Sequence, residues 1–281
     1  MNLFTNKKSR NAIASTSILL CLIGLIFVMF NKPVMGIEFT GGTVYTVKSD
    51  LAKVTAIVGN DSAFKLSKDG SYTIVKTSLK SGTEHPALEK IKAMASTSEH
   101  IGPSLGSELI HDSIVGLALS FLLIAIYLAI RYNLMMALSA LLALAHDVLL
   151  TIVILALFKV EISSIVVGAV LTVVGYSIND SVVTLDKLRE VIRDKVDDPI
   201  QSAIEITLTR NIRTCVATML VIISMYLFGG DMVHDFSFTM LCGVTFGMIS
   251  SITVMPLLLA ISSRRFDSLS TTQAPSVEGN I

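Results

Sequence analysis

The hydrophobic positions of this chain gather into six long runs, separated by polar segments of unequal length. A membrane-spanning helix needs about 20 mostly apolar residues, and each run is close to that length. The spans that we predict cover residues 12–30, 113–130, 134–158, 162–185, 213–230 and 236–261. The pattern therefore predicts an α-helical membrane protein with six transmembrane helices.

The first two spans are separated by the longest polar segment, residues 31–112. Its pattern predicts strands at 37–47, 63–66 and 72–77, helices at 50–58 and 87–95, and a last strand near His100. Lys68-Asp69-Gly70 is a hairpin signal between the second and third of these strands. The order of elements favours a small α+β domain with a ferredoxin-like fold.

The distribution of lysine and arginine predicts how the spans are oriented. Cytoplasmic loops are enriched in these residues, whereas a long domain crosses the membrane largely regardless of its charge. The N-terminus (1–11), the loop 186–212 and the C-terminal tail (262–281) are basic enough to be cytoplasmic, and Lys159 is the one basic residue in the short outer links. We therefore expect both termini in the cytoplasm and the α+β domain outside, in the periplasm.

The first span resembles a signal sequence in its basic flank and apolar core. Phe30-Asn31-Lys32-Pro33 follows it, however, instead of a cleavage site built from small residues. We therefore expect an uncleaved signal anchor.

Composition supports the membrane class and excludes several others. The chain is 52% hydrophobic and 16% charged, with a formal net charge of zero. A zero net charge gives no electrostatic reason to expect a nucleic-acid partner. Cys21, Cys215 and Cys242 all fall inside apolar runs, where their spacing suits neither a disulfide framework nor a metal site.

Ionisable residues inside the predicted spans are the candidates for function. Placing an ionised side chain in hydrocarbon costs about 2.5–3.5 kcal/mol or more, so such residues normally serve a purpose. They are His146, Asp147, Asp180, Arg210 and Arg213. Counted at about 1.5 Å per residue, Asp147 lies about 20 Å and Asp180 about 8 Å from the cytoplasmic end of its span. We therefore expect Asp180, and not Asp147, to meet one of the arginines.

Each of these candidates also has an ordinary structural interpretation. Asp180 is either a helix-end carboxylate that reaches cytoplasmic water or a titratable group that faces its neighbours. His146 and Asp147 point about 100° apart on a helix and are equally well explained as a structural hydrogen-bonded pair. Small residues at helical spacing predict close helix packing; they are Gly168, Thr172, Gly175, Gly243 and Gly247.

Several segments, in order along the chain, resemble the SecF family of the bacterial Sec protein-translocation machinery. The most specific is GYSINDSVVTLDKLRE at 175–190. The others are GIEFTGGT at 36–43, IGPSLGSEL at 101–109, ALAHDV at 143–148 and YLFGG at 226–230. The family belongs to the resistance-nodulation-division superfamily, so the resemblance implies a non-enzymatic subunit that uses the proton gradient, with protons as coupling ions and no cofactor.

The resemblance also implies partners, a location and site residues. The expected partners are SecD, the SecYEG channel, YajC and an unfolded preprotein, in the bacterial inner membrane. The family's functional aspartate and arginine correspond to Asp180 and Arg210, the latter through the pattern Thr207-Leu208-x-Arg210. Secondary candidates for proton coupling are Arg213, Asp147, His146, Asn179 and Tyr176. The motif of the outer domain comprises Gly36, Glu38, Phe39, Gly41, Gly42 and Thr43.

Some positions depart from the family pattern. Glu38 stands where an aspartate is usual and Asn211 where a threonine follows the arginine. Cys215 and Ala217 replace hydroxyl residues.

Three other functions fit parts of the pattern. Asp147 and Asp180 on consecutive spans suggest an intramembrane aspartyl protease, although the expected depth mismatch and the missing Gly-x-Gly-Asp motif disfavour it. An exporter of small molecules or lipids from the same superfamily is a second alternative. The third is a scaffold in which Asp180 and Arg210 only lock helices together.

Overall fold

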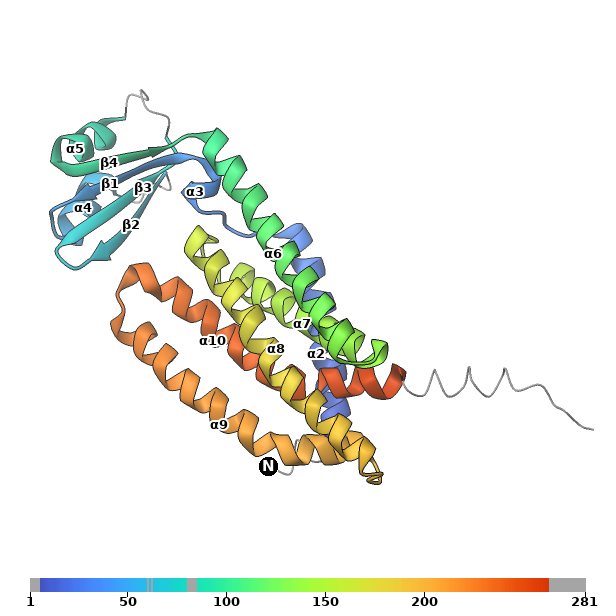
Figure 1. The fold of residues 1–281 in the computed structure, drawn as a ribbon. Coiled ribbons are helices and arrows are strands. Elements are labelled where there is room, and N and C mark those ends of the chain that lie inside the picture. Colours follow the sequence, from blue (N-terminus) through green and yellow to red (C-terminus); the bar gives the residue numbers. More distant parts are fainter. Residues whose placement is uncertain (1–5, 60, 62, 80–84, 263–281) are drawn as a thin grey trace, which may run out of the picture.

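The computed structural model describes residues 6–59, 61, 63–79 and 85–262, and within them a helical bundle carries a small α+β domain at one end (Figure 1). Six helices are long and apolar enough to cross a membrane. They are α2 (Lys7–Phe30), α6 (Pro103–Arg131), α7 (Leu134–Leu157), α8 (Ser164–Arg193), α9 (Pro199–Phe228) and α10 (Asp231–Ile252) together with a helical segment at 254–262. The prediction of six helical spans is confirmed in number and order; the predicted tail lies outside the described residues from 263 onward.

Two of the helices extend well beyond the hydrophobic runs, so most of the predicted cytoplasmic loop 186–212 is helical; its location in the cytoplasm stays a prediction. α8 continues to Arg193 and α9 already begins at Pro199. Asp198 caps α9 by accepting from the Gln201 N–H, and Pro199 suits the first helical position because its missing N–H would have no partner there. The extensions are amphipathic, and a hydropathy window does not detect such segments.

The last span is broken at Thr253. Pro256 lacks the N–H that would bond to the carbonyl of Ile252, and its ring crowds that carbonyl. Residues 254–262 consequently leave the axis of α10 as a separate helical segment, the dark red one in Figure 1.

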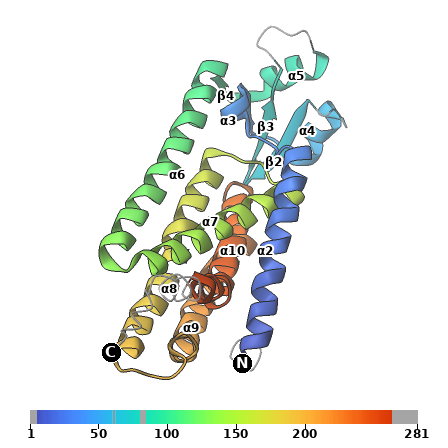
Figure 2. The same cartoon turned by 90° about the vertical axis from the view of Figure 1, so that its right-hand side faces the viewer.

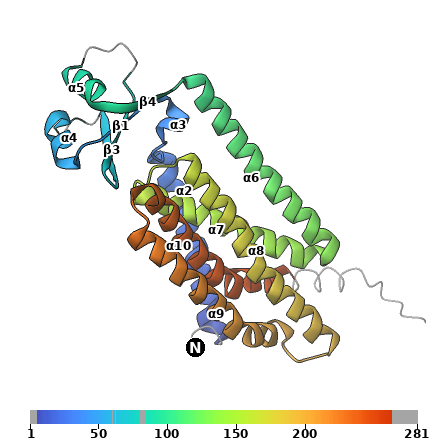
Figure 3. The same cartoon turned by 60° about the vertical axis from the view of Figure 1, so that its left-hand side comes forward.

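The small domain has the predicted ferredoxin-like order of elements. Its strands β1 (Gly42–Val47), β2 (Phe64–Asp69), β3 (Tyr72–Thr77) and β4 (Ala95–Ile101) form an antiparallel sheet in the order β2-β3-β1-β4. The helices α4 (Leu51–Val58) and α5 (Pro86–Met94) lie on one face of the sheet (Figure 3). Between sheet and helices lies a core that includes Val47, Val54, Val75, Leu88 and Ile91.

The first part of the predicted strand 37–47 is instead a short helix, α3 (Ile37–Thr40). Gly41 separates this helix from β1 with a φ of 77°, a conformation that favours glycine. Gly42 follows at a close approach to β3, because a Cβ there would lie 2.6 Å from the carbonyl oxygen of Thr77. Gly41 is therefore explained by its backbone conformation, and Gly42 by the close approach of the neighbouring strand.

α8 is the central helix of the bundle and contacts α6, α7, α9 and α10. The close packing predicted for α10 is confirmed. A Cβ on Gly243 would lie 2.2 Å from Val173, and one on Gly247 would lie 3.0 Å from Ser177. The packing expected along α8 at Gly168, Thr172 and Gly175 is not found among the described residues: all three are exposed, and no described atom outside the helix's own backbone lies within 4 Å of a Cβ added to either glycine.

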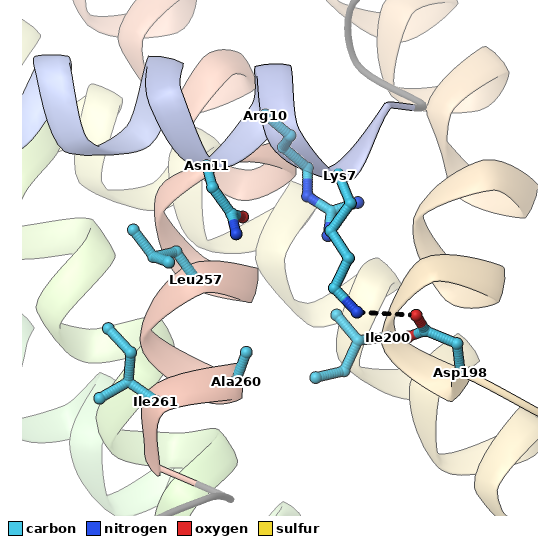
Figure 4. Close-up of a pocket in the computed structure, with 8 residues that line it drawn as sticks. All are labelled: Lys7, Arg10, Asn11, Asp198, Ile200, Leu257, Ala260 and Ile261. Atoms are coloured by element: carbon cyan, nitrogen blue, oxygen red, sulfur yellow. Dashed lines mark hydrogen bonds and ion pairs between the residues drawn. The ribbon is translucent and has the colours of Figure 1, made fainter.

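α2 stands at one side of the bundle, against α7 (Figure 2). At the end away from the small domain, the Lys7 Nζ donates to the Asp198 Oδ2 at 2.8 Å, beside Ile200 and Leu257 (Figure 4). The hydrogen bond from Lys7 lowers the pKa of Asp198. This contact ties the beginning of α2 to the beginning of α9.

The two kinds of glycine should respond oppositely to alanine. Gly243→Ala forces a methyl group into Val173 and should destabilise the isolated chain by about 1–3 kcal/mol, as overpacking does. Gly175→Ala, the matched control, should be neutral or stabilising by up to about 1 kcal/mol because its Cβ enters open space and alanine favours the helix. Thermal unfolding in detergent micelles measures both, and equal effects would contradict the packing described.

Candidate functional site

Asp147 lies at the centre of a hydrogen-bond network that joins four helices. Its side chain is fully buried. The Oδ2 atom accepts from the hydroxyl of Ser177 on α8 at 2.6 Å and from that of Ser250 on α10 at 2.7 Å. The Oδ1 atom is 3.2 Å from the His146 Nδ1, and the Nε2 of the same ring is 3.1 Å from the Ser17 hydroxyl on α2. His146 and Asp147 are thus hydrogen-bonded to each other, and their part in proton coupling stays a prediction.

The expected difference in depth between Asp147 and Asp180 is wrong. Ser177, which donates to Asp147, lies one helical turn before Asp180 on α8, about 4.5 Å along the axis. α8 also runs on beyond the predicted end of its span to Arg193, which lies about 20 Å along the axis from Asp180. The two aspartates therefore lie at neighbouring levels near the middle of the bundle.

Asp180 is as buried as Asp147 but is not satisfied in the same way. The residue is 1% exposed, and its Oδ2 atom is buried without a hydrogen-bond partner among the described residues. Its own carbonyl oxygen accepts from the Thr184 hydroxyl at 3.1 Å, one turn further along α8. The Oδ2 atom has therefore lost water without gaining a hydrogen-bond donor from the described residues in return.

Arg210 and Arg213 on α9 are both exposed, and within the part of the chain that the structure covers neither forms an ion pair with Asp180. Arg210 is nevertheless the charged group that acts electrostatically on Asp180. The arginine and the aspartate therefore attract each other across the contact between α8 and α9 without a closed salt bridge.

The remaining secondary candidates flank this contact. Asn179 is exposed on α8. Tyr176 is half-buried, one turn before Asp180, and lies next to Thr214 and Thr218 of α9. These side chains make the α8–α9 contact polar at the level of Asp180.

The motif at 36–43 connects the small domain to the beginning of α8. The Glu38 carboxylate accepts from the backbone N–H of Ser164 at 2.8 Å and from its hydroxyl, at the first turn of α8. The Gly36 N–H donates to the Ile162 carbonyl at 2.8 Å. Phe39 is buried, and Thr43 is hydrogen-bonded to the ring of His100 at 3.1 Å.

A second connection runs through Glu161 in the link between α7 and α8. Its carboxylate is 3.3 Å from the Lys65 Nζ on β2 and 3.8 Å from the Lys76 Nζ on β3. These groups line a cavity of about 480 Å³ between the sheet and the helix ends. The open face of the sheet is therefore held against the helix that carries Asp180.

Hydrogen-bonding residues without charge were missed by the sequence interpretation. Ser17, Ser177, Ser250, Thr184 and Asn211 contribute to the polar layer around the two aspartates. Serine and threonine are tolerated in apolar helices because they can bond to the carbonyl four residues earlier. Their spacing of one turn from Asp180 was the available signal for Ser177 and Thr184.

Removing the hydroxyl groups around Asp147 should loosen the bundle. Ser177→Ala and Ser250→Ala should each cost about 0.5–1.5 kcal/mol of stability, and the double variant should cost more than their sum because the Oδ2 atom then has no donor. Ser224→Ala is the matched control, since that hydroxyl bonds only to the Leu220 carbonyl of its own helix. Thermal unfolding in detergent micelles measures these changes in stability. The network would be contradicted if each single variant lost no more stability than Ser224→Ala and the double variant lost only the sum of the two.

Comparisons with known proteins place this arrangement of spans and domain in a family. Residues 82–265 match the C-terminal family of the SecD/SecF protein export membrane proteins, and residues 26–50 match the SecD/SecF GG motif. The SecF protein translocase subunit of Rickettsia prowazekii is 32% identical over 92% of this chain and 91% of its own length. That of Calditerrivibrio nitroreducens is also 32% identical, over 82% and 84%.

The same likeness extends to solved structures. SecDF from Thermus thermophilus, described as a translocon-associated membrane protein, matches 91% of this chain with a TM-score of 0.79 and 27% identity. SecDF in a super-membrane-facing form matches with a TM-score of 0.76. This chain spans 38% of the first SecDF chain and 39% of the second. The chain belongs to the SecD/SecF family of protein export membrane proteins, as a relative of the SecF translocase subunits.

Proposed function

We propose that this chain uses the proton gradient, together with SecD, to promote the late stage of preprotein export through SecYEG, with YajC as a further associate. In this proposal it lies in the bacterial inner membrane with both termini in the cytoplasm and the small domain in the periplasm. The observation that carries the proposal is the buried Asp180 carboxyl group: its Oδ2 has no hydrogen-bond donor among the described residues, and the exposed Arg210 is near enough to act on it electrostatically.

The energetics of Asp180 suit a reversible proton carrier. Burial without donors favours the neutral acid, whereas the guanidinium of Arg210 favours the carboxylate. Taking up a proton cancels the attraction across the α8–α9 contact, and releasing it restores that attraction. One charge that moves through 100 mV gains about 2.3 kcal/mol, enough to bias a two-state helix contact by about fifty-fold.

The movement would reach the small domain along α8. A shift of α8 moves its first turn, to which Glu38 is bonded, and the neighbouring Glu161, which holds Lys65 and Lys76 of the sheet. The sheet is thereby coupled to protonation at Asp180 by direct contacts. We propose that the small domain in turn acts on an unfolded preprotein outside the membrane.

A partner helix is expected on the open side of α8. Gly168, Thr172, Gly175 and Asn179 recur along this side and are exposed in the described structure. Small residues allow close approach between helices in lipid, and SecD is the proposed owner of the helix that packs there.

The protease alternative is not favoured even though Asp147 and Asp180 lie at neighbouring levels. A catalytic aspartate pair shares a proton between adjacent carboxyl groups. Here both oxygens of Asp147 are hydrogen-bonded to His146, Ser177 and Ser250, and no bond among the described residues joins Asp147 to Asp180.

Asp180→Asn tests the coupling directly. The amide has the size of the acid but cannot exchange a proton, so assembly with SecD should persist while the gradient-dependent stage of export falls at least tenfold. Translocation into inverted vesicles, with and without a proton gradient, measures this. Glu190→Gln, an exposed carboxylate on the same helix, is the control; normal gradient dependence in the Asp180 variant would refute the proposal.

Glu161→Gln tests the connection between domain and bundle. Loss of the charge that Lys65 and Lys76 share should weaken the docking by about 0.2–1 kcal/mol at low salt, and the difference from the wild type should fade at high salt. Spin labels on Ser67 and Lys159 should show a longer and broader distance distribution. Glu99→Gln removes a carboxylate from the same cavity that has no ion pair in the described structure; an equal effect there would contradict a specific role of Glu161.

A further inference from the structure

Three buried polar atoms in the contact between α8 and α9 have no hydrogen bond among the described residues: the Oδ2 of Asp180, the Oδ1 of Asn211 and the hydroxyl oxygen of Tyr176. The first two are acceptors without a hydrogen of their own. Both residues are 1% exposed. Buried polar atoms are nearly always hydrogen-bonded, so two unpartnered acceptors at one contact indicate a missing hydrogen between them.

Thr184 places the amide of Asn211 beside Asp180. The Asn211 Nδ2 donates to the Thr184 Oγ1 at 3.5 Å, and that hydroxyl donates to the Asp180 carbonyl oxygen at 3.1 Å. Residues four apart on a helix lie on one face, so Asn211 faces the side of α8 that carries Asp180. The hydrogen of the Thr184 hydroxyl is used on the backbone and cannot satisfy either acceptor.

The other ionisable groups near Asp180 do not supply that hydrogen. From α9, Arg210 acts only through its charge, and Cys215 is a buried thiol. From α7, Asp147 and its His146 are committed to their own network. On α8 itself, the Tyr176 hydroxyl has no hydrogen bond among the described residues, but it lies one turn away, toward Thr214 and Thr218 of α9. No charged side chain of the described parts of α6 or α10 acts on Asp180.

We propose that Asn211 is the positioning residue for the protonated state of Asp180, in which the carboxylic acid O–H on Oδ2 donates to the Asn211 Oδ1. This inference rests on the proposed function. The proton comes from the outer medium and leaves to the cytoplasm, while Asn211 keeps its own hydrogens throughout. One added proton thus satisfies both buried acceptors.

Asn211 and Arg210 then favour opposite states from neighbouring positions on α9. The amide stabilises the neutral acid by a hydrogen bond, and the guanidinium stabilises the carboxylate by its charge. The balance between them sets the outer pH at which the coupling cycle runs. Asn211 therefore contributes to the pH dependence of the coupling cycle in this chain.

Asn211→Val and Asn211→Thr separate this role from packing, because the two side chains have the same shape and only threonine carries a hydroxyl acceptor. Gradient-dependent export is measured in inverted vesicles with SecD present, while the lumenal pH, which corresponds to the outer side, is varied at fixed cytoplasmic pH. In the valine variant, the lumenal pH for half-maximal export should move by about one unit to the acid side, the effect of losing one hydrogen bond of ordinary strength. The threonine variant should stay close to the wild type.

Controls distinguish failure of the inference from failure of the proposed function. Thr209→Val, at an exposed neighbouring position, should leave the pH profile unchanged. If Asp180→Asn abolishes the gradient-dependent stage but the valine and threonine variants share the wild-type pH profile, only the role of Asn211 is refuted. If Asp180→Asn exports normally, the proposed function itself is refuted.

Two further outcomes are decisive. A valine variant that loses yield without a shift in pH profile shows a purely structural role and overturns the inference; Asn211→Ser against Asn211→Ala repeats the comparison if valine does not fold. A response of these variants to Na⁺ concentration instead of pH would assign the two acceptors to a metal cation and overturn the proton bond.

Discussion

A carboxyl group enclosed by apolar helices needs hydrogen-bond donors in place of the water that it has lost. In this chain Asp147 has such donors, whereas the Oδ2 of Asp180 has none among the described residues. Asp147 receives hydrogen bonds from Ser177 and Ser250 and lies beside His146, so three contacts from its surroundings stabilise it and it joins the helices. Asp180, one turn from Ser177, is equally buried, but its Oδ2 has no hydrogen bond from the part of the chain that the structure describes. The same residue type at neighbouring levels therefore serves packing in one place and proton exchange, as we propose, in the other.

α8 brings these features together. Its first turn is bonded to Glu38 of the small domain, its middle donates to Asp147 and carries Asp180, and one side packs against the glycines of α10. In the proposed cycle, a helix with these contacts moves as a unit. A small change in attraction at the α8–α9 contact can consequently act on the sheet through rigid elements, without a flexible linker between them.

The pattern of the chain predicted much of this architecture. Hydropathy runs identify the six helices because a span needs a minimum apolar length, and turn residues such as Gly70 identify the order of strands. The helix ends were not predicted, since α8 and α9 continue as amphipathic segments outside the apolar runs. That error made Asp180 look close to a helix end and separated it wrongly from Asp147. Gly168 and Gly175 were predicted to pack like Gly243 and Gly247, but spacing does not say whether the neighbour belongs to the same chain.

The sequence by itself determined that the chain spans a membrane, that it carries a small α+β domain, and that Asp180 is an acid inside the bundle. Those properties depend on local composition and on the spacing of hydrophobic residues, and both can be read directly from the sequence. Only the tertiary structure decided that Ser177 and Ser250 satisfy Asp147, that Asn211 faces Asp180 through Thr184, and that Glu161 holds the sheet. These are contacts between helices far apart in sequence, and periodicity specifies which face of a helix is buried but not which atoms meet it across the bundle.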